Sequence, residues 1–369
     1  MGPSILFDKS AIQSLGQGAL HEVSRYFYTV VPPVLLMETL ADLSLNPDDL
    51  EGAKTKVAEI ADKVFPIDSI ANAHFQTMCV HNLLGDDVPM RRVPAVAGAR
   101  PVTAKDGSKG MFIDIQSENE AVMRWRSGRF SEEDLKFAVE WRESARGSNL
   151  EVMKQALPKP PVRIRSAEDV GTVVDLMLAE PELQKPLLCW FLSLLRCDAE
   201  TTERVCVHWK WAVDRSLASF APYAFYCLRV QLIYYIGMMQ GFFGTRPSNI
   251  VDLEYLCYTP FAFVFCSGDK LHRQLAPFVL QDDQSFVDRD DLQKSLSEMA
   301  ALRTNASDAE PGEGSLIRHL WLKHWKKPPP PTVRRQISEE ESKRLMESVK
   351  PIMDALREQE RQRNCRFPV

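Results

Sequence analysis

Two aspartates each follow an apolar run that could form a buried strand. Asp8 comes directly after Ile5-Leu-Phe7, and Asp269 comes after the run from Phe261 to Cys266 and a strand-breaking Gly268. Continuous apolar runs of this kind are typical of parallel strands buried on both faces. The carboxyl ends of such strands meet at one edge of an open α/β sheet, where ligands bind. We therefore expect the two carboxylates to converge at that edge.

Two further acids could reach the same edge. Glu38 lies beside the apolar stripe of a helix that we expect to follow Pro32-Pro33, where an unpaired carboxylate is costly. It either pairs with an Arg or Lys or points inward as a ligand, and Asp42, one turn later, could take that role in its place. Asp252 opens a short segment ahead of the second strand. With Asp8 and Asp269, these residues make a set of acids on four separate segments.

Clustered carboxylates favour one kind of chemistry. They repel one another unless a cation neutralises them, and ligand sets made of oxygen alone favour Mg²⁺ or Mn²⁺ over zinc. One or two such ions can activate water for in-line attack on a phosphodiester and stabilise the leaving oxygen. The chain has no Walker-type phosphate loop, no GxGxxG after a strand, no GxSxG elbow and no HExxH. Nor does it offer a helper histidine at a recognisable spacing, so the predicted chemistry depends on carboxylates and a divalent cation.

Three cations near these segments are candidates for contacts with a substrate. Lys270 and Arg273 follow Asp269 at the start of the next helix, where they could hold a backbone phosphate or be ordinary surface charges. Arg229 interrupts a strongly apolar helix, so it either pairs with an acid or faces the site. The sequence alone does not choose between these interpretations.

A basic stretch, residues 91–165, contains two more candidates. Arg124 and Arg126 flank a tryptophan there. Alternating aromatic and cationic groups are typical of surfaces that bind nucleic acids. A solvated amphipathic helix with one buried tryptophan explains the same pattern equally well.

The segments that carry the acids resemble the motif blocks of PIN-domain nucleases in their order and spacing. These segments are Ile5-Leu-Phe-Asp8-Lys-Ser, Val31-Pro-Pro-Val-Leu-Leu-Met-Glu38, and Asp252 through Val264-Phe-Cys-Ser-Gly-Asp269. The resemblance implies an α/β fold with a PIN-like central parallel sheet flanked by helices. It implies a Mg²⁺- or Mn²⁺-dependent endonuclease, with RNA favoured over DNA. It also implies that Asp8 and Asp269 are the principal metal ligands, and that Glu38 and Asp252 complete the acidic site or order its waters.

The same resemblance suggests how the chain is divided. Residues 1–85 would form the N-terminal half of the PIN-like domain, and 220–290 its C-terminal half. Between them, 86–219 would be a large, mostly helical insertion with a β-hairpin near 101–114, where Asp106-Gly107 separates extended segments. Residues 291–369 would be an extension with a proline-rich linker and a charged helix.

Composition limits where the protein works. The chain has 369 residues, 45% of them hydrophobic, and a net charge of −5, which gives no general attraction to nucleic acids or anionic membranes. Eight cysteines without a CxxC pair indicate reduced thiols and a cytoplasmic location. The apolar run before Asp8 is too short for a signal peptide. We expect Phe220–Phe243 to be a core helix and not a membrane span, because Arg229 and Gln231 interrupt it.

Two other functions remain open from the sequence. The chain could be an interaction protein that keeps a PIN-like scaffold and docks protein partners through the helical insertion or the C-terminal tail. It could also be a different metal-dependent hydrolase that acts on a small phosphate ester. Four converging acids favour the nuclease, because a scaffold has no physical need for them.

Overall fold

The computed structural model describes most of the chain up to residue 305. The described residues are 3–46, 48–64, 73–95, 100–103, 109–112, 116–146, 155–158, 160, 163–211, 216–305 and 323. They divide into two compact units, residues 2–96 with 116–329 and a smaller unit that includes 97–115. The expected charged helix near the C-terminus lies outside the described residues.

In the smaller unit, the described residues form one antiparallel pair of strands. Strand β3 (Arg100–Thr103) pairs with β4 (Lys109–Phe112), with Val102 opposite Gly110. This confirms the hairpin expected near 101–114. Its Asp106-Gly107 turn lies outside the described residues.

The larger unit is built on a parallel sheet of four strands in the order β2-β1-β5-β6. They are β1 (Ser4–Phe7), β2 (Tyr28–Val30), β5 (Val264–Ser267) and β6 (Ser285–Asp288). All three pairings are parallel, and β1 is central, paired with β2 on one side and β5 on the other. The predicted α/β class with a parallel sheet flanked by helices is therefore confirmed. The strands before Asp8 and Asp269 are neighbours, as expected.

Two details of the sheet differ from the prediction. The apolar run from Phe261 begins as a 3-10 turn, η2 (Thr259–Phe261), so β5 starts only at Val264. Pro260 lies in the first turn of η2, where proline is favoured because its fixed φ suits a helical start. The edge strand β6 was not predicted.

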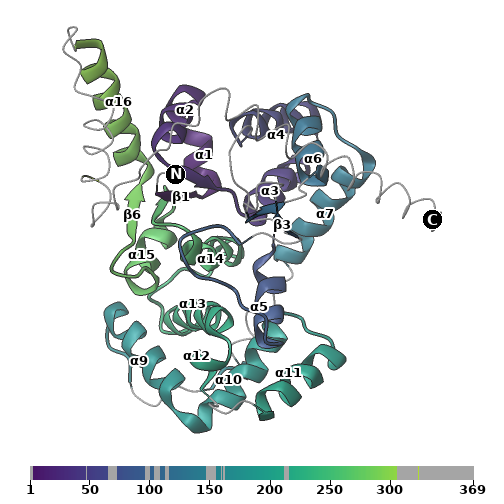
Figure 1. Ribbon diagram of the computed structural model, residues 1–369, viewed down its shortest axis with the longest axis vertical. Helices are drawn as coiled ribbons and strands as arrows, with labels where there is room; N and C mark the ends of the chain where they lie inside the picture. Colours follow the sequence, from purple (N-terminus) through teal and green to yellow (C-terminus); the bar gives the residue numbers. More distant parts are fainter. Residues whose placement is uncertain are drawn as a thin grey trace. The chain divides into compact units, whose positions relative to one another are not determined.

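Helices follow the strands closely enough to position the acids. Helix α1 (Lys9–Ser14) begins directly after β1 and packs against β5, and α2 (Gln17–Tyr26) leads on to β2. Both helices lie beside β1 in Figure 1. After β2 come α3 (Pro33–Leu40), with Pro33 at its first position, and the 3-10 turn η1 (Ala41–Ser44). Proline suits a first helical turn because that N–H has no partner within the helix. Helix α14 (Asn249–Cys257) precedes β5, and α15 (Lys270–Val279) lies between β5 and β6 in the sequence. Helix α16 (Arg289–Asn305) follows β6.

The remaining helices of this unit bury their apolar faces in two hydrophobic clusters, the larger of which contains the sheet. They are α4 (Leu50–Val64), α5 (Phe75–Leu83), α6 (Gln116–Arg126), α7 (Glu132–Arg146), α9 (Ala167–Ala179), α10 (Pro181–Leu194), α11 (Ala199–Trp211), α12 (Leu217–Phe220) and α13 (Pro222–Met239). One hydrophobic cluster joins Leu6 of the sheet to Val174 and Leu188 of the predicted insertion. Helices α9 and α10 of the predicted insertion therefore pack into the sheet's own core, whereas α6 buries Val122 and Trp125 in a second cluster.

Helix α13 is the expected core helix. It is buried along most of its length and packs against α5, α9 and α14 (Figure 1). The side-chain oxygen of Asn82 accepts the otherwise free N–H groups of Tyr223 and Ala224 at its start, at 2.9 and 3.2 Å. Among the helices described, none combines the length and apolar character needed to cross a bilayer.

Replacing Leu6 with alanine should lower the free energy of unfolding by about 2–5 kcal/mol. Leu6 has no exposed surface and lies in a central strand, so truncation leaves a cavity in the hydrophobic core that covers the face of the sheet. Urea unfolding measures the change. Leu45→Ala is the matched control, because Leu45 is 53% exposed and should lose less than about 0.5 kcal/mol. Equal losses would contradict this description of the core.

Candidate active site

Asp8 is the buried centre of the acidic site. It caps the start of α1, where one carboxylate oxygen accepts the N–H of Ala11 at 2.8 Å. The other oxygen accepts the hydroxyl of Ser267, at the end of β5, at 2.6 Å. The Ser10 hydroxyl also donates to this carboxylate, at 2.9 Å. Both oxygens of Asp8 are therefore held by groups of the chain itself.

His272 of α15 supplies a positive charge beside Asp8. It is fully buried, and its Nδ1 lies 2.7 Å from the Ser267 hydroxyl and 3.3 Å from the Asp8 carboxylate. Because that hydroxyl gives its proton to Asp8, Nδ1 must donate. Nε2 faces the backbone carbonyl of Asp252 at 2.7 Å, so it must donate as well. A histidine that donates from both nitrogens is an imidazolium.

The pKa values agree with this assignment. Burial lowers the pKa of His272, but the hydrogen bond and charge of Asp8 outweigh burial and raise it to about 9. Burial likewise opposes ionisation of Asp8, yet His272 and then Ser267 lower the pKa of its carboxyl. The two side chains form a buried, charge-assisted pair at the end of the central strands.

Glu38 is held by groups from two other elements. Its Oε2 accepts the hydroxyl of Tyr255 in α14 at 2.7 Å, and its Oε1 lies 3.8 Å from the ammonium of Lys9. Burial raises the pKa of Glu38, whereas the Lys9 charge and the Tyr255 hydroxyl lower it. Asp42 does not take its place, because Asp42 binds Lys9 directly at 2.7 Å and lies 3.7 Å from Arg142. Glu38 therefore lies near a lysine, the first of its two predicted roles, and also near the other acids, whereas its role as a ligand stays a prediction.

Asp252 and Asp269 complete the set. Asp269 caps α15, where one oxygen accepts the N–H of Leu271 at 2.6 Å. Burial raises the pKa of the Asp252 carboxyl to about 7, and the positive charge of His272 opposes this rise. The negative charges of Asp269, Glu38 and Asp8 add to it. The structure thus brings all four predicted acids within electrostatic range of one another.

The sequence prediction missed the histidine. We expected no helper histidine, but His272 lies beside both Asp8 and Asp252. The sequence does contain a pattern that indicates a buried histidine, because His272, Leu275 and Val279 are spaced so that they share one face of α15. The charged residues next to it concealed that pattern.

The predicted substrate cations near Asp269 are exposed. Lys270 is the first residue of α15, beside Asp269, and its side chain is exposed. Arg273, one turn later, is exposed and forms an ion pair with Asp288 at the end of β6. Both lie on the helix that begins at the acidic site.

The other predicted cations are paired elsewhere. Arg229 pairs with Asp175 of α9 at 2.6 Å, the first of its two predicted roles. Arg124 pairs with Asp134 at 3.3 Å, and Arg126 pairs with Asp62. The tryptophan between Arg124 and Arg126 is buried, as the amphipathic-helix interpretation requires.

The donor chemistry of this site suits a hard divalent cation, although the side chains do not form a ready-made cage. The four acids offer only oxygen, which Mg²⁺ and Mn²⁺ prefer. Within the described part of the chain, no three His, Cys, Asp or Glu side chains are arranged to hold a metal ion. The charges of Lys9 and His272 neutralise part of the acidic cluster in place of a metal.

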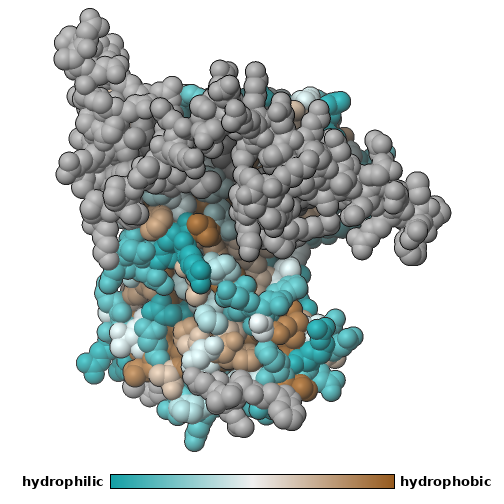
Figure 2. Space-filling model, viewed as in Figure 1, coloured by the Kyte–Doolittle hydropathy of each residue, from teal (hydrophilic) through white to brown (hydrophobic). Residues whose placement is uncertain are grey.

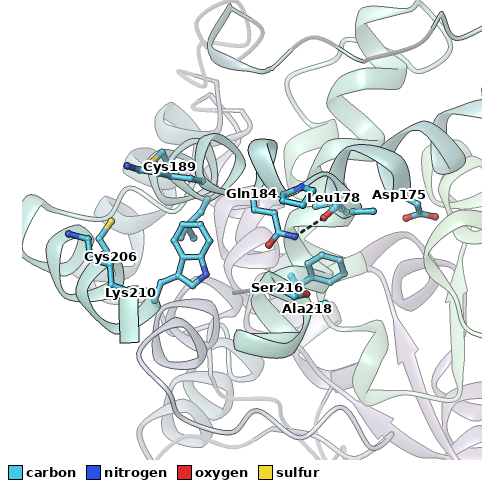
Figure 3. A pocket seen from close by; sticks show the side chains of 14 residues that line it. Asp175, Leu178, Gln184, Cys189, Cys206, Lys210, Ser216 and Ala218 are labelled. Carbon is cyan, nitrogen blue, oxygen red and sulfur yellow. Dashed lines mark hydrogen bonds between the residues drawn. The ribbon is translucent and has the colours of Figure 1, made fainter. Parts of the chain in front are cut away.

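A separate cavity of about 1140 Å³ lies among α9 to α13 (Figure 3). Its lining is mainly apolar, with the thiols of Cys189 and Cys206 and the ammonium groups of Lys185 and Lys210. Gln184 lines this cavity, and its side-chain amide donates a hydrogen bond to the backbone carbonyl of Leu178, as Figure 3 shows. Over this helical region the surface in Figure 2 mixes apolar and hydrophilic side chains. None of the four acids lines this cavity.

Comparison with known proteins identifies no relative. No family model, curated protein or solved structure matches the chain. The site must therefore be interpreted from its own geometry.

Replacing Asp252 with asparagine should stabilise the metal-free protein at neutral and higher pH. The folded-state pKa of about 7 lies above the usual 3.8, so ionisation of Asp252 costs stability as the pH rises through this range. The gain should be on the order of 1–3 kcal/mol at pH 8 and should vanish towards pH 4. Thermal unfolding across this range tests it, with the exposed Asp282→Asn as control. Equal shifts in both variants would contradict the burial effect.

Wild-type protein should also lose stability as the pH rises from 6.5 to about 9. The folded-state pKa of His272 is raised above 6.5, so its stabilising contribution is complete below 6.5 and is lost as the pH approaches 9. His272→Gln should remove this slope and cost about 3–5 kcal/mol at pH 6.5, because Asp8 loses its partner. Urea unfolding at several pH values measures both effects. His21→Gln, at an exposed position, should keep the slope.

Proposed function

We propose that this protein is a divalent-metal-dependent nuclease that hydrolyses phosphodiester bonds, with RNA as its substrate. The observation that carries the proposal is the meeting of four acids from four segments at one edge of an all-parallel sheet. Asp8 and Asp269 follow its two neighbouring strands, whereas Glu38 and Asp252 come from α3 and α14. Such an edge is the usual ligand site of open α/β sheets.

The proposed fold is PIN-like, with the parallel sheet split by the helical segment 86–219. The order of the four acids along the chain supports it, as does the adjacency of β1 and β5. The preference for RNA comes from the sequence resemblance.

Each acid has a proposed role. Asp8 and Asp269 are the principal ligands of Mg²⁺ or Mn²⁺, and Glu38 completes the set. A bound cation would supply a polarised water and stabilise the leaving oxygen. Asp252, whose carboxylate lies within electrostatic range of the other three acids, would order this water and accept its proton.

The surrounding side chains hold these acids in place. Ser267 and His272 fix Asp8, and Tyr255 fixes Glu38. Lys270 and Arg273, exposed on the helix that begins at Asp269, contact the substrate phosphates. Their charges provide the attraction that the net charge of −5 does not.

A non-catalytic scaffold is the second candidate, and one observation favours it. The Asp8 carboxylate is fully used within the chain, and the described residues contain no preformed metal cage. In this case Lys9 and His272 would permanently replace the cation.

Asp269→Asn should abolish cleavage of labelled single-stranded RNA in Mn²⁺ or Mg²⁺, by about 100-fold or more. Asparagine keeps the oxygen that caps α15, so the fold should be retained. Asp269 is a better probe than Asp8, whose replacement would also break the pair with His272. The matched control is Asp282→Asn, an exposed acid just before β6, which should cleave like the wild type.

Thermal stability with and without Mn²⁺ completes the experiment. Metal-induced stabilisation that is lost in Asp269→Asn supports a metal site even without a cleavable substrate. Neither cleavage nor metal-induced stabilisation in the wild type would reject the nuclease in favour of the scaffold. Cleavage of DNA but not RNA would correct the substrate and leave the chemistry intact.

A further inference from the structure

Helix α14 contributes to a second site on its other face. Asp252 and Glu254 are two positions apart, so they point to different sides of the helix. Asp252 belongs to the acidic site, whereas Glu254 lines a cavity of about 370 Å³. Met37, next to Glu38 in α3, lines the same cavity. The two sites therefore share both helices.

Glu254 carries an unsatisfied oxygen at this cavity. Its Oε2 is buried and accepts no hydrogen bond from the described residues. His74 lies beside it, with its Nε2 3.5 Å from Oε2, which is within the range of an ion pair when His74 is protonated but longer than the usual hydrogen bond. A buried acceptor without a donor costs free energy. The terminal torsion of a glutamate rotates easily, so a ligand with N–H donors could satisfy both oxygens.

The walls of the cavity are suited to a flat ring. Phe75, Phe191 and Tyr235 line it and are buried, and Trp141 lines it while partly exposed. Aromatic faces of this kind stack on unpaired nucleobases. The volume falls within the range of about 300–1,000 Å³ that is common for small-ligand sites.

Arg196 adds a positive charge at the same cavity. It follows α10 in a left-handed conformation, with φ of 55°, where glycine is the favoured residue. Its guanidinium donates to the Ser144 hydroxyl at 3.0 Å, and no carboxylate among the described residues pairs with it. An arginine in a strained backbone conformation, which lies beside a cavity and has no carboxylate partner among the described residues, is suited to bind a phosphate group.

We infer that this cavity binds a guanine nucleotide of the substrate strand. Guanine presents two adjacent N–H donors on its Watson–Crick edge, which match the two oxygens of Glu254. Adenine presents only one donor group there, and its ring nitrogen would face a carboxylate oxygen. The guanine ring stacks against Trp141, and its phosphate pairs with Arg196. The choice of ligand rests on the proposed nuclease function, but binding can be measured without cleavage.

Calorimetric titration of the full chain with GMP, AMP and guanosine tests this inference. Wild type should bind GMP about 10-fold or more tightly than AMP. Glu254→Gln should weaken GMP binding by about 10-fold or more, because one of the two acceptors becomes a donor. Arg196→Gly should fold at least as well, since glycine suits the left-handed position. It should weaken GMP binding but leave guanosine binding unchanged.

Asp252→Asn separates this inference from the nuclease proposal. This variant should bind GMP like the wild type while losing cleavage. GMP binding that depends on Glu254, with neither cleavage nor metal-induced stabilisation in the wild type, would reject the nuclease but keep the guanine site. Equal affinity for GMP and AMP, no GMP binding, or unchanged GMP binding in Glu254→Gln would overturn the guanine site and leave the nuclease proposal unaffected.

Discussion

The buried ion pair between Asp8 and His272 is the interaction on which the acidic edge of this protein depends. It joins the end of β1 to α15, and Ser267 brings the end of β5 into the same network. The second ring nitrogen of His272 holds the backbone of α14 at Asp252. One imidazolium thus links β1, near the N-terminus, to three elements that lie between residues 249 and 279. Removing one partner of such a pair leaves an uncompensated buried charge, which is far more costly than losing a surface ion pair.

The same charge balance explains how several carboxylates can share a small volume. Lys9 neutralises Asp42 and approaches Glu38, and His272 neutralises Asp8. Burial is the main reason that the pKa of the Asp252 carboxyl rises to about 7, and the negative charges of Asp269, Glu38 and Asp8 add to it. Under the nuclease proposal this group is poised to exchange a proton, whereas in a scaffold it would only be a cost.

The sequence allowed the sheet edge to be predicted because β1 and β5 each lie in an apolar segment, and an aspartate follows each of these segments. It did not reveal β6, in which Phe286 and Val287 are flanked by Ser285 and Asp288, since so short a run does not differ from a loop. His272 was concealed for a different reason. Its role depends on contacts with β1 and α14, and no local pattern contains long-range pairing. The divalent cation was predicted from the clustered carboxylates and the RNA substrate from resemblance alone, and both are proposals.

Helix α14 sets the relation between the two proposed sites. Asp252 and Tyr255, three positions apart, share the face that meets the acids, and Glu254 faces the neighbouring cavity. Leu253 and Leu256 are buried, so the helix cannot rotate without breaking the core. A base held by Glu254 would therefore stand at a fixed distance from the acids. Because a rigid helix transmits position better than a loop does, the choice of base and the choice of scissile bond would be set by one element.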